Sequence, residues 1–463
     1  MNRKIVSLTI ALLASLAPYV AAGPTGDFVP EQMVCKVMPG YSVDSINQQY
    51  GTSVTRYLSH ISAYLLETQP GQNAESLAAV IATDPQVVYC SANYLLDAPE
   101  AVQSSQPFLD AVPSTDPMTQ TAATTLQLSS TQSVTTGDGV LVGVIDAGIN
   151  LAHPTLQPAA TSGYDFIAND SSAIDEEGGR GSGHGTFVAG VINLVAPDAH
   201  LIAYRVLDTT GRGDGFMIAD ALLTAVDQGC KVINLSIVMS GKHDVLDEAI
   251  EFARNQNVMV IAAAGNDSSE VELFPALDSY VLAVAAVDSL DQKSLYSNYH
   301  GKIDICAPGD SVYAPYLDSA YAWWDGTSFA APFVAATAAL IYAIKPTATW
   351  EEVRDALLNT TVNIDSQNPA YVGKLGQGRL DPLAAVQFIQ QTCCVGTTGN
   401  LDGVGTVDLS DLSLLIAYIT MSNVRPTCRA EWNLNSQGAI DLTDLSIMIA
   451  YVTGSLSQLP LCP

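Results

Sequence analysis

Short apolar runs alternate with amphipathic segments over residues 137–391, and this alternation predicts a parallel β-sheet with helices on both faces. The apolar runs that predict buried strands lie at 140–145, 200–206, 231–237, 258–263 and 281–286. Helical patterns occupy 184–194, 215–229, 244–256 and 329–344. The predicted fold class is therefore α/β, a doubly wound parallel sheet.

A separate pattern over residues 30–98 predicts a small α+β domain of the ferredoxin-like type. Strands are expected at 32–38, 53–59, 62–68 and 86–92, with helices near 43–50 and 73–83. In this β-α-β-β-α-β order the first and last strands lie side by side, and they carry Cys35 and Cys90. We predict that these cysteines form a disulfide, two buried free thiols being the alternative.

The segments around this domain have no such pattern. Residues 99–136 are rich in Pro, Ser, Thr and Gln, which predicts a linker and the start of the next domain. Residues 1–22 combine a basic start, an apolar run and the small residues Val20-Ala21-Ala22, which is typical of a secretory signal. We expect a secreted protein with no membrane span after signal cleavage, an uncleaved anchor being the alternative.

The last domain, residues 392–463, contains an internal repeat. Residues 400–418 realign with 433–451, and each copy starts like a calcium loop and continues into a helix with one apolar face. The candidate ligands are Asn400, Asp402, Asp408, Asp411, Asn433, Asn435, Asp441 and Asp444. Val404 and Gln437 stand where each loop normally has an acid, so either the loops bind calcium or they are degenerate and keep only the fold.

Composition narrows the classes of function. The chain has 463 residues and a formal net charge of −29, which argues against binding nucleic acid or anionic membranes. Export makes the eight cysteines plausible disulfide formers. Cys230 and Cys306 are expected to be buried thiols, and the four C-terminal cysteines allow three pairings.

Four polar residues stand beside glycines at the ends of predicted strands and helices, where open α/β sheets place their chemistry. They are Asp146, His184, Asn266 and Ser328, the last within GTSFAAP at the start of an apolar helix. Read singly, each is a cap, a structural histidine or a turn former. Read together they supply an orienting acid, a base, an oxyanion donor and a nucleophile.

The strings around these residues resemble the subtilisin-like serine proteases, the subtilases. They are VIDAGINLAHPTL, GHGTFVAG, VAPDAHLIAYRVLD, KVINLSI, AAAGND and DGTSFAAP, within residues 105–391. The resemblance implies a subtilisin-like sheet in which Ser328 is the nucleophile, His184 the general base, and Asp146 the group that orients it. It also implies that Asn266 helps to form an oxyanion hole and that Ser236 and Gly265 contact a protein or peptide substrate. No cofactor is expected for catalysis.

The sequence departs from the family pattern near the site. Ala147 replaces the usual Ser or Thr, whose hydroxyl can bond to the catalytic carboxylate. Ile237, Val238 and Met239 replace a leucine and paired glycines, which predicts a narrower or reshaped specificity pocket. Asp325 places a carboxylate near the nucleophile, either favouring cationic substrates or simply solvated.

The outer domains carry resemblances of their own. Residues 23–98, ending in VVYCSANYLL, resemble the inhibitory propeptide of many subtilases, with a cut expected between about Leu96 and Thr125. The C-terminal repeat pair resembles a dockerin, whose family role is calcium-stabilised docking to a cohesin partner. We therefore expect a secreted, self-processing serine endopeptidase. The alternative is an inactive subtilase-like adhesion or scaffold protein.

Overall fold

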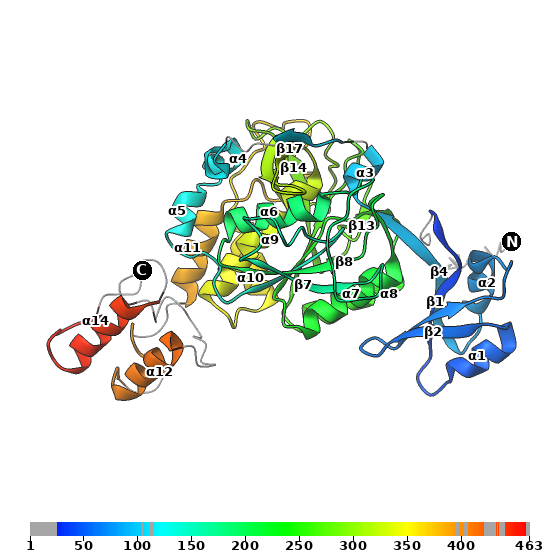
Figure 1. Cartoon of the computed structure of the whole chain (residues 1–463), viewed down its shortest axis with the longest axis horizontal. Helices are drawn as coiled ribbons and strands as arrows, with labels where there is room; N and C mark the ends of the chain where they lie inside the picture. Colours follow the sequence, from blue (N-terminus) through cyan, green and yellow to red (C-terminus); the bar gives the residue numbers. More distant parts are fainter. Residues whose placement is uncertain are drawn as a thin grey trace, which may run out of the picture.

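The structure is a computed structural model that describes residues 26–103, 105–110, 115–393, 398–401, 406–420, 432, 434 and 440–459. Three bodies follow one another along the molecule: an N-terminal unit, a central body and a C-terminal helix pair (Figure 1). The expected signal, residues 1–22, lies outside the described residues.

The central body is built on a seven-stranded sheet in the order β15-β14-β12-β10-β6-β8-β7, with every neighbouring pair parallel. Its strands are β6 (Leu141–Asp146), β7 (Ala160–Asp165), β8 (His200–Arg205), β10 (Val232–Leu235), β12 (Met259–Ala263), β14 (Val281–Val287) and β15 (Ile305–Pro308). The predicted α/β fold with a doubly wound parallel sheet is confirmed. The five predicted strands are all present, and two more, β7 and β15, extend the sheet at its edges.

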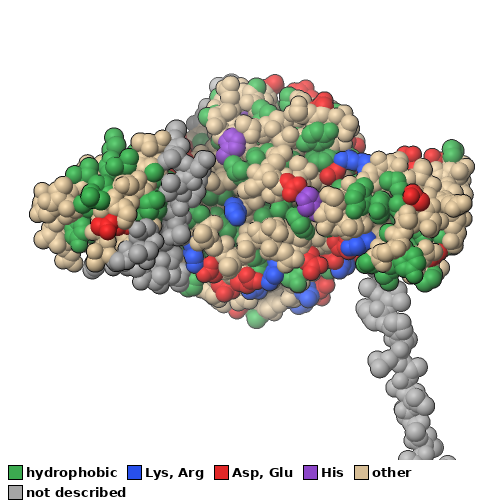
Figure 2. Space-filling view, turned by 90° about the horizontal axis from the view of Figure 1, so that it is seen from below, with side chains coloured by type: hydrophobic (Ala, Val, Ile, Leu, Met, Phe, Trp, Pro, Cys, Tyr) green, Lys and Arg blue, Asp and Glu red, His purple; other side chains and the backbone are tan. Residues whose placement is uncertain are grey.

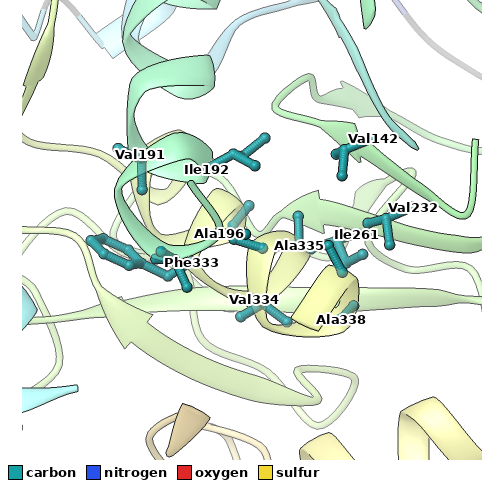
Figure 3. Close-up of a cluster of buried hydrophobic side chains, with 14 of the residues drawn as sticks. Val142, Val191, Ile192, Ala196, Val232, Ile261, Phe333, Val334, Ala335 and Ala338 are labelled. Carbon is teal, nitrogen blue, oxygen red and sulfur yellow. The ribbon is translucent and has the colours of Figure 1, made fainter. Parts of the chain in front are cut away.

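Helices cover both faces because successive residues of each strand point to opposite sides. Val232 belongs to the apolar cluster shared with α6 (His184–Val195) and α9 (Thr327–Ile344), part of which is drawn in Figure 3. Its neighbour Ile233 belongs to the cluster shared with α7 (Gly215–Asp227) and α8 (Asp244–Asn255). All residues of α9 are buried, as its almost wholly apolar sequence predicts.

Helix α9 is also the one helix in the described part of the chain that is long and apolar enough to cross a membrane. Its 18 residues carry no charge. Every residue of that run is buried between the sheet and neighbouring helices, which is the environment of a core helix.

The N-terminal unit has the predicted element order. It comprises β1 (Phe28–Val37), α1 (Val43–Tyr50), β2 (Ser53–Leu58), β3 (Ala63–Glu67), α2 (Ala74–Ile81) and β4 (Val87–Asp97). Strands β1 and β4 pair antiparallel with Cys35 opposite Cys90, and the predicted disulfide between them is present. The last strand runs five residues beyond its predicted end at residue 92, and this extension crosses from the N-terminal unit to the central body (Figure 1).

Ion pairs join the N-terminal unit to α7 and α8. Lys36 pairs with Glu248 at 2.6 Å, and Arg56 pairs with Asp220. Basic and acidic side chains lie together where the two bodies meet (Figure 2). In the same contact, His60 Nε2 lies 3.1 Å from Asp227 Oδ1.

Residues 99–136, expected to be a linker and the start of the next domain, are folded into short elements over most of their length. The elements are α3 (Pro99–Gln103), β5 (Phe108–Asp110), a 3-10 turn (Pro117–Thr119), α4 (Thr121–Thr125) and α5 (Leu128–Gln132). Strand β5 pairs with β17 (Tyr321–Trp324), and Leu126 and Leu128 are buried in the core. Periodicity missed these elements because each is only three to five residues long.

The remaining elements complete the body and the tail. They are β9 (Arg212–Asp214), β11 (Met239–Ser240), β13 (Leu273–Phe274), β16 (Val312–Pro315), α10 (Trp350–Leu358), α11 (Pro382–Cys393), α12 (Leu409–Ile419) and α14 (Leu442–Val452). The last two are the helices expected from the repeat, and they pack on each other through a small apolar cluster. Cys230 and Cys306 are buried free thiols, as predicted. The pairing of the four C-terminal cysteines falls outside the side chains that the structure describes.

Candidate active site

Asp146 and His184 meet at the carboxyl edge of the central sheet. Strand β6 ends at Asp146 and α6 begins at His184, so both side chains are fixed by regular elements. His184 Nδ1 lies 2.7 Å from Asp146 Oδ1, which also accepts a 2.7 Å hydrogen bond from the Ala147 amide. The second oxygen, Asp146 Oδ2, is buried with no hydrogen-bond partner in the described chain. The alanine at 147 thus leaves that oxygen without the hydroxyl the family pattern would provide.

A second buried acid, Asp175, which no sequence pattern singled out, holds the start of α6. Its carboxylate accepts hydrogen bonds from the amides of Gly183 at 2.9 Å and Thr186 at 3.0 Å, and from the Thr186 hydroxyl at 2.6 Å. Burial raises the pKa of Asp175 to about 7, although these hydrogen bonds act in the opposite direction. An acid nine residues before a histidine is too weak a signal to find this role from sequence.

Ser328 occupies the first turn of α9, where Pro332 changes the backbone hydrogen bonding. Proline has no N–H, so the Ser328 carbonyl loses its usual partner four residues along the helix. The hydroxyl of Ser236 donates to that carbonyl instead, at 2.9 Å. Ser236, predicted to contact substrate, therefore has a buried side chain that secures the backbone of the nucleophile. Ser328 Oγ is buried and bonds to no described residue.

Asn266 is oriented by the residue that precedes the candidate nucleophile. Its Oδ1 accepts from the Thr327 amide at 3.0 Å and from the Thr327 hydroxyl at 2.8 Å. The amide group Nδ2 is thereby turned toward the space above Ser328. Gly265 has φ +99°, and a Cβ there would lie 2.6 Å from Leu273, so glycine lets the strand end pass this close.

Glu100, which no sequence pattern singled out, fills that space. Its Oε1 accepts from Asn266 Nδ2 at 2.8 Å and from the Ser328 amide at 3.4 Å, while Oε2 lies 3.1 Å from His184 Nε2. The carboxylate is fully buried. It contacts three of the four predicted site residues at once.

The Glu100 carboxylate and the imidazole stabilise each other's charged forms. Burial alone would raise the pKa of Glu100, but the hydrogen bond and charge of His184 lower it below its ordinary value. Burial alone would lower the pKa of His184, but Asp146 and then Glu100 raise it to about 10. In this arrangement His184 is protonated at neutral pH and has no free lone pair with which to act as a base.

The chain leading to Glu100 lies in the cleft as an added strand. Residues 95–97 pair antiparallel with β9, and Ala98 donates to the Gly211 carbonyl at 2.8 Å. On the other side, Asp97 and Val238 exchange two hydrogen bonds of 3.0 and 2.8 Å. The segment is therefore held on both edges, the manner in which an extended peptide binds between two strands.

Beside this strand is a cavity of about 360 Å³ lined by Pro99, Val238, Met239, Asn266 and Leu273 among others. Val238 and Met239, which stand where the family pattern has glycines, line this cavity with largely buried side chains. Asp325 does not take part: it is exposed, and its carboxylate accepts a 2.6 Å hydrogen bond from the Ser311 amide.

The predicted calcium ligands are only partly described. Asp408 and Asp441 serve as helix N-caps, accepting from the amides of Ser410 and Thr443. Asp411 and Asp444 are fully buried carboxylates at the twelfth loop position, where calcium loops place an acid. Asn400 is partly buried, and Asp402, Asn433 and Asn435 lie outside the described residues. No group of three potential metal-binding side chains occurs in the part of the chain that the structure covers.

Comparison with known proteins gives a consistent result for the central body. Residues 137–381 match the family model Peptidase_S8, described as the subtilase family. Thermitase of Thermoactinomyces vulgaris is 34% identical over 273 residues, which are 57% of this chain and 94% of thermitase. Subtilisin BL of Lederbergia lenta is 37% identical over 242 residues, 50% of this chain and 87% of its own.

Two solved structures are similar as well. A protease from Pseudoalteromonas arctica superposes with a TM-score of 0.53 at 31% identity, covering 57% of this chain and 94% of that one. Fervidolysin from Fervidobacterium pennivorans, described as a keratinolytic enzyme related to subtilisin, gives a TM-score of 0.65 over 79% of this chain and 62% of its own. At 21% identity the second likeness is one of fold.

Proposed function

Because the chain belongs to the subtilase family of serine-type endopeptidases, we propose that it cleaves peptide bonds through an acyl-enzyme formed on Ser328. His184 takes the proton of the Ser328 hydroxyl and later gives it to the leaving amine. Asp146 holds the imidazole through the 2.7 Å hydrogen bond at Nδ1 and stabilises the imidazolium that forms.

The observation that carries this proposal is the convergence of two N–H donors on one buried oxygen. The Asn266 side chain and the Ser328 amide both donate to Glu100 Oε1, a negatively charged oxygen beside the serine. A tetrahedral intermediate develops negative charge on its oxygen at such a position, so the same donors would stabilise it. Ser236 and Gly265 would contribute to the substrate cleft chiefly through the backbone they position.

The N-terminal unit is proposed to keep the enzyme inactive as a zymogen. Its last strand occupies the cleft, and Glu100 blocks His184 and both oxyanion donors. Activity would follow cutting of the chain after the unit, between about Leu96 and Thr125, and removal of the inhibitory segment from the cleft. A signal at residues 1–22 would export the protein before this happens.

The C-terminal repeat pair is proposed as a calcium-stabilised module that docks to a cohesin-like partner. Support comes from the loop pattern and from the buried acids Asp411 and Asp444, because calcium loops carry an acid at the twelfth position. Calorimetric titration of the full chain with calcium tests the assignment, with Asp411→Asn plus Asp444→Asn as the control. Equal heats from both proteins at millimolar calcium would contradict it.

Fluorophosphonate labelling tests the catalytic proposal directly. The wild-type chain and Ser328→Ala are expressed, and labelling and the mature N-terminus are followed by mass spectrometry. We expect labelling and self-cleavage of the wild type and neither for the variant. A folded wild type that is neither labelled nor processed would favour the alternative, an inactive subtilase-like adhesion or scaffold protein.

A further inference from the structure

Residues 95–98 lie in the cleft as an extended strand, so their positions indicate where the residues of a bound peptide would lie. Ala98 is the last residue bonded to the segment around β9, and the chain then turns into α3, sending the Glu100 carboxylate to the oxyanion donors. A substrate that continues straight in the same register would place its next carbonyl, that of the residue equivalent to Pro99, at those donors. Asp97 therefore stands at the third residue upstream of the bond to be cut, and Leu96 at the fourth.

The side chain of Asp97 is bound by Arg212. Arg212 Nε lies 2.7 Å from Asp97 Oδ1, and Nη2 lies 3.4 Å from Oδ2, so both carboxylate oxygens face the guanidinium. The two backbone hydrogen bonds between Asp97 and Val238 fix the residue that carries this carboxylate. The contact is therefore set by the register of the strand, and any residue at the same place in a substrate faces the same arginine.

The Arg212 guanidinium forms no ion pair with any described acid of the central body. Its other ion pair is with Asp27, at 2.9 Å, and Asp27 and Asp97 both belong to the N-terminal unit. Among the described residues no further ion pair involves Arg212. When the N-terminal unit leaves, a guanidinium on the wall of the cleft loses both of its carboxylate partners.

We propose that Arg212 gives the mature protease a preference for Asp or Glu at the third residue upstream of the cleaved bond. This inference rests on the proposed function and specifies the substrates of that same cleft. The guanidinium is 39% exposed, so solvent screens the pair and the preference is moderate. A solvent-screened contact of this kind corresponds to about a 2- to 5-fold difference in kcat/KM between Asp and Asn.

The test uses processed enzyme and peptides that differ only at this position. The peptides contain Leu-Asp-Ala-Xaa, Leu-Asn-Ala-Xaa or Leu-Lys-Ala-Xaa, where Xaa is a mixture of residues, and mass spectrometry counts the cuts after Xaa. We expect the most cuts after Xaa in the Asp peptides, fewer in the Asn peptides and the fewest in the Lys peptides. These differences should become smaller at high salt. Arg212→Gln should remove the preference, and Arg212→Glu should reverse it in favour of Lys.

Lys302→Glu is the matched control, because it makes the same charge change as Arg212→Glu. Lys302 is exposed and lies just before β15, at the amino edge of the sheet, whereas the site lies at the carboxyl edge. The Lys302→Glu enzyme should cleave the three kinds of peptide in the same order of preference as the wild type. If the enzyme cleaves all three kinds of peptide equally, or if Arg212→Gln keeps the preference, the proposed role of Arg212 is overturned. The proposed protease function is not affected by either result. Failure to cleave any peptide would overturn the proposed function and this inference with it.

Discussion

Replacing Glu100 by glutamine removes one charge from the cleft while keeping the shape of the side chain. The glutamine oxygen can still accept from Asn266 and Ser328, the contacts of 2.8 and 3.4 Å. What is lost is the interaction with protonated His184 at 3.1 Å. A hydrogen bond to a charged group contributes about 1.5–3 kcal/mol. The open form of the zymogen should therefore become about 10- to 150-fold more populated.

The rate of fluorophosphonate labelling of the unprocessed chain measures this opening, because the reagent reaches Ser328 only when the Glu100 segment has left. We expect labelling of Glu100→Gln to be faster by that factor and self-processing to begin sooner. Glu100→Asp, which keeps the charge on a side chain one carbon shorter, is the control for a change of geometry alone.

The pH dependence gives a second, independent check. Glu100 is one of the groups that raise the pKa of His184 from its ordinary value to about 10 in the closed form, so the ion pair stabilises that form fully below the ordinary value, and this stabilisation is lost as the pH rises toward about 10. On the acid side the pair weakens as the pH falls through the lowered pKa of Glu100. Labelling of the wild type should rise with pH, and the rise should occur at lower pH in Glu100→Gln. Equal rates and equal pH profiles would refute the reasoning.

Three further predictions follow from buried polar groups. Asn266→Ala removes one oxyanion donor and should lower kcat by about 10²- to 10³-fold with little change in KM, measured on processed enzyme; a loss below tenfold would contradict the assignment. Ala147→Ser offers a donor to Asp146 Oδ2 and should stabilise the fold by about 1 kcal/mol, seen as a thermal midpoint higher by roughly 2–4 °C; an unchanged midpoint would mean the hydroxyl does not reach. Burial lowers the pKa of His243 to about 4, so protons bind the unfolded chain more readily. Stability should thus fall by up to about 3 kcal/mol between pH 6.5 and 4, and His243→Gln should flatten that part of a denaturation series; parallel curves would argue against it.

The central strands and helices were predictable because burial on both faces of a parallel sheet requires continuous apolar runs such as VMVIAAA. The edge strands were not, since Ala160–Asp165 is polar with a glycine and Ile305–Pro308 is four residues long and ends in proline. These two strands form because they pair with the neighbouring strands β8 and β14, and their own sequences lack a strand pattern.

The same contrast applies to the site. Asp146, His184, Asn266 and Ser328 stand at element ends with flanking glycines, and the structure brings them together. The role of Glu100 depends on where a strand from another body ends, and no local pattern records that position. The Asp97–Arg212 contact was hidden for the same reason, because its members are 115 residues apart.

The oxyanion donors that hold Glu100 are those proposed to stabilise the intermediate of peptide cleavage. The rate of turnover and the rate of zymogen release are therefore coupled, and selection cannot adjust them separately at these donors. A substitution that makes the pocket a better receptor for negative charge would speed turnover and, at the same time, delay the release of the zymogen. One that weakens the pocket would release a slower enzyme sooner. Laboratory evolution for faster cleavage should therefore recover compensating changes at Glu100 or elsewhere in α3, away from the residues that touch substrate.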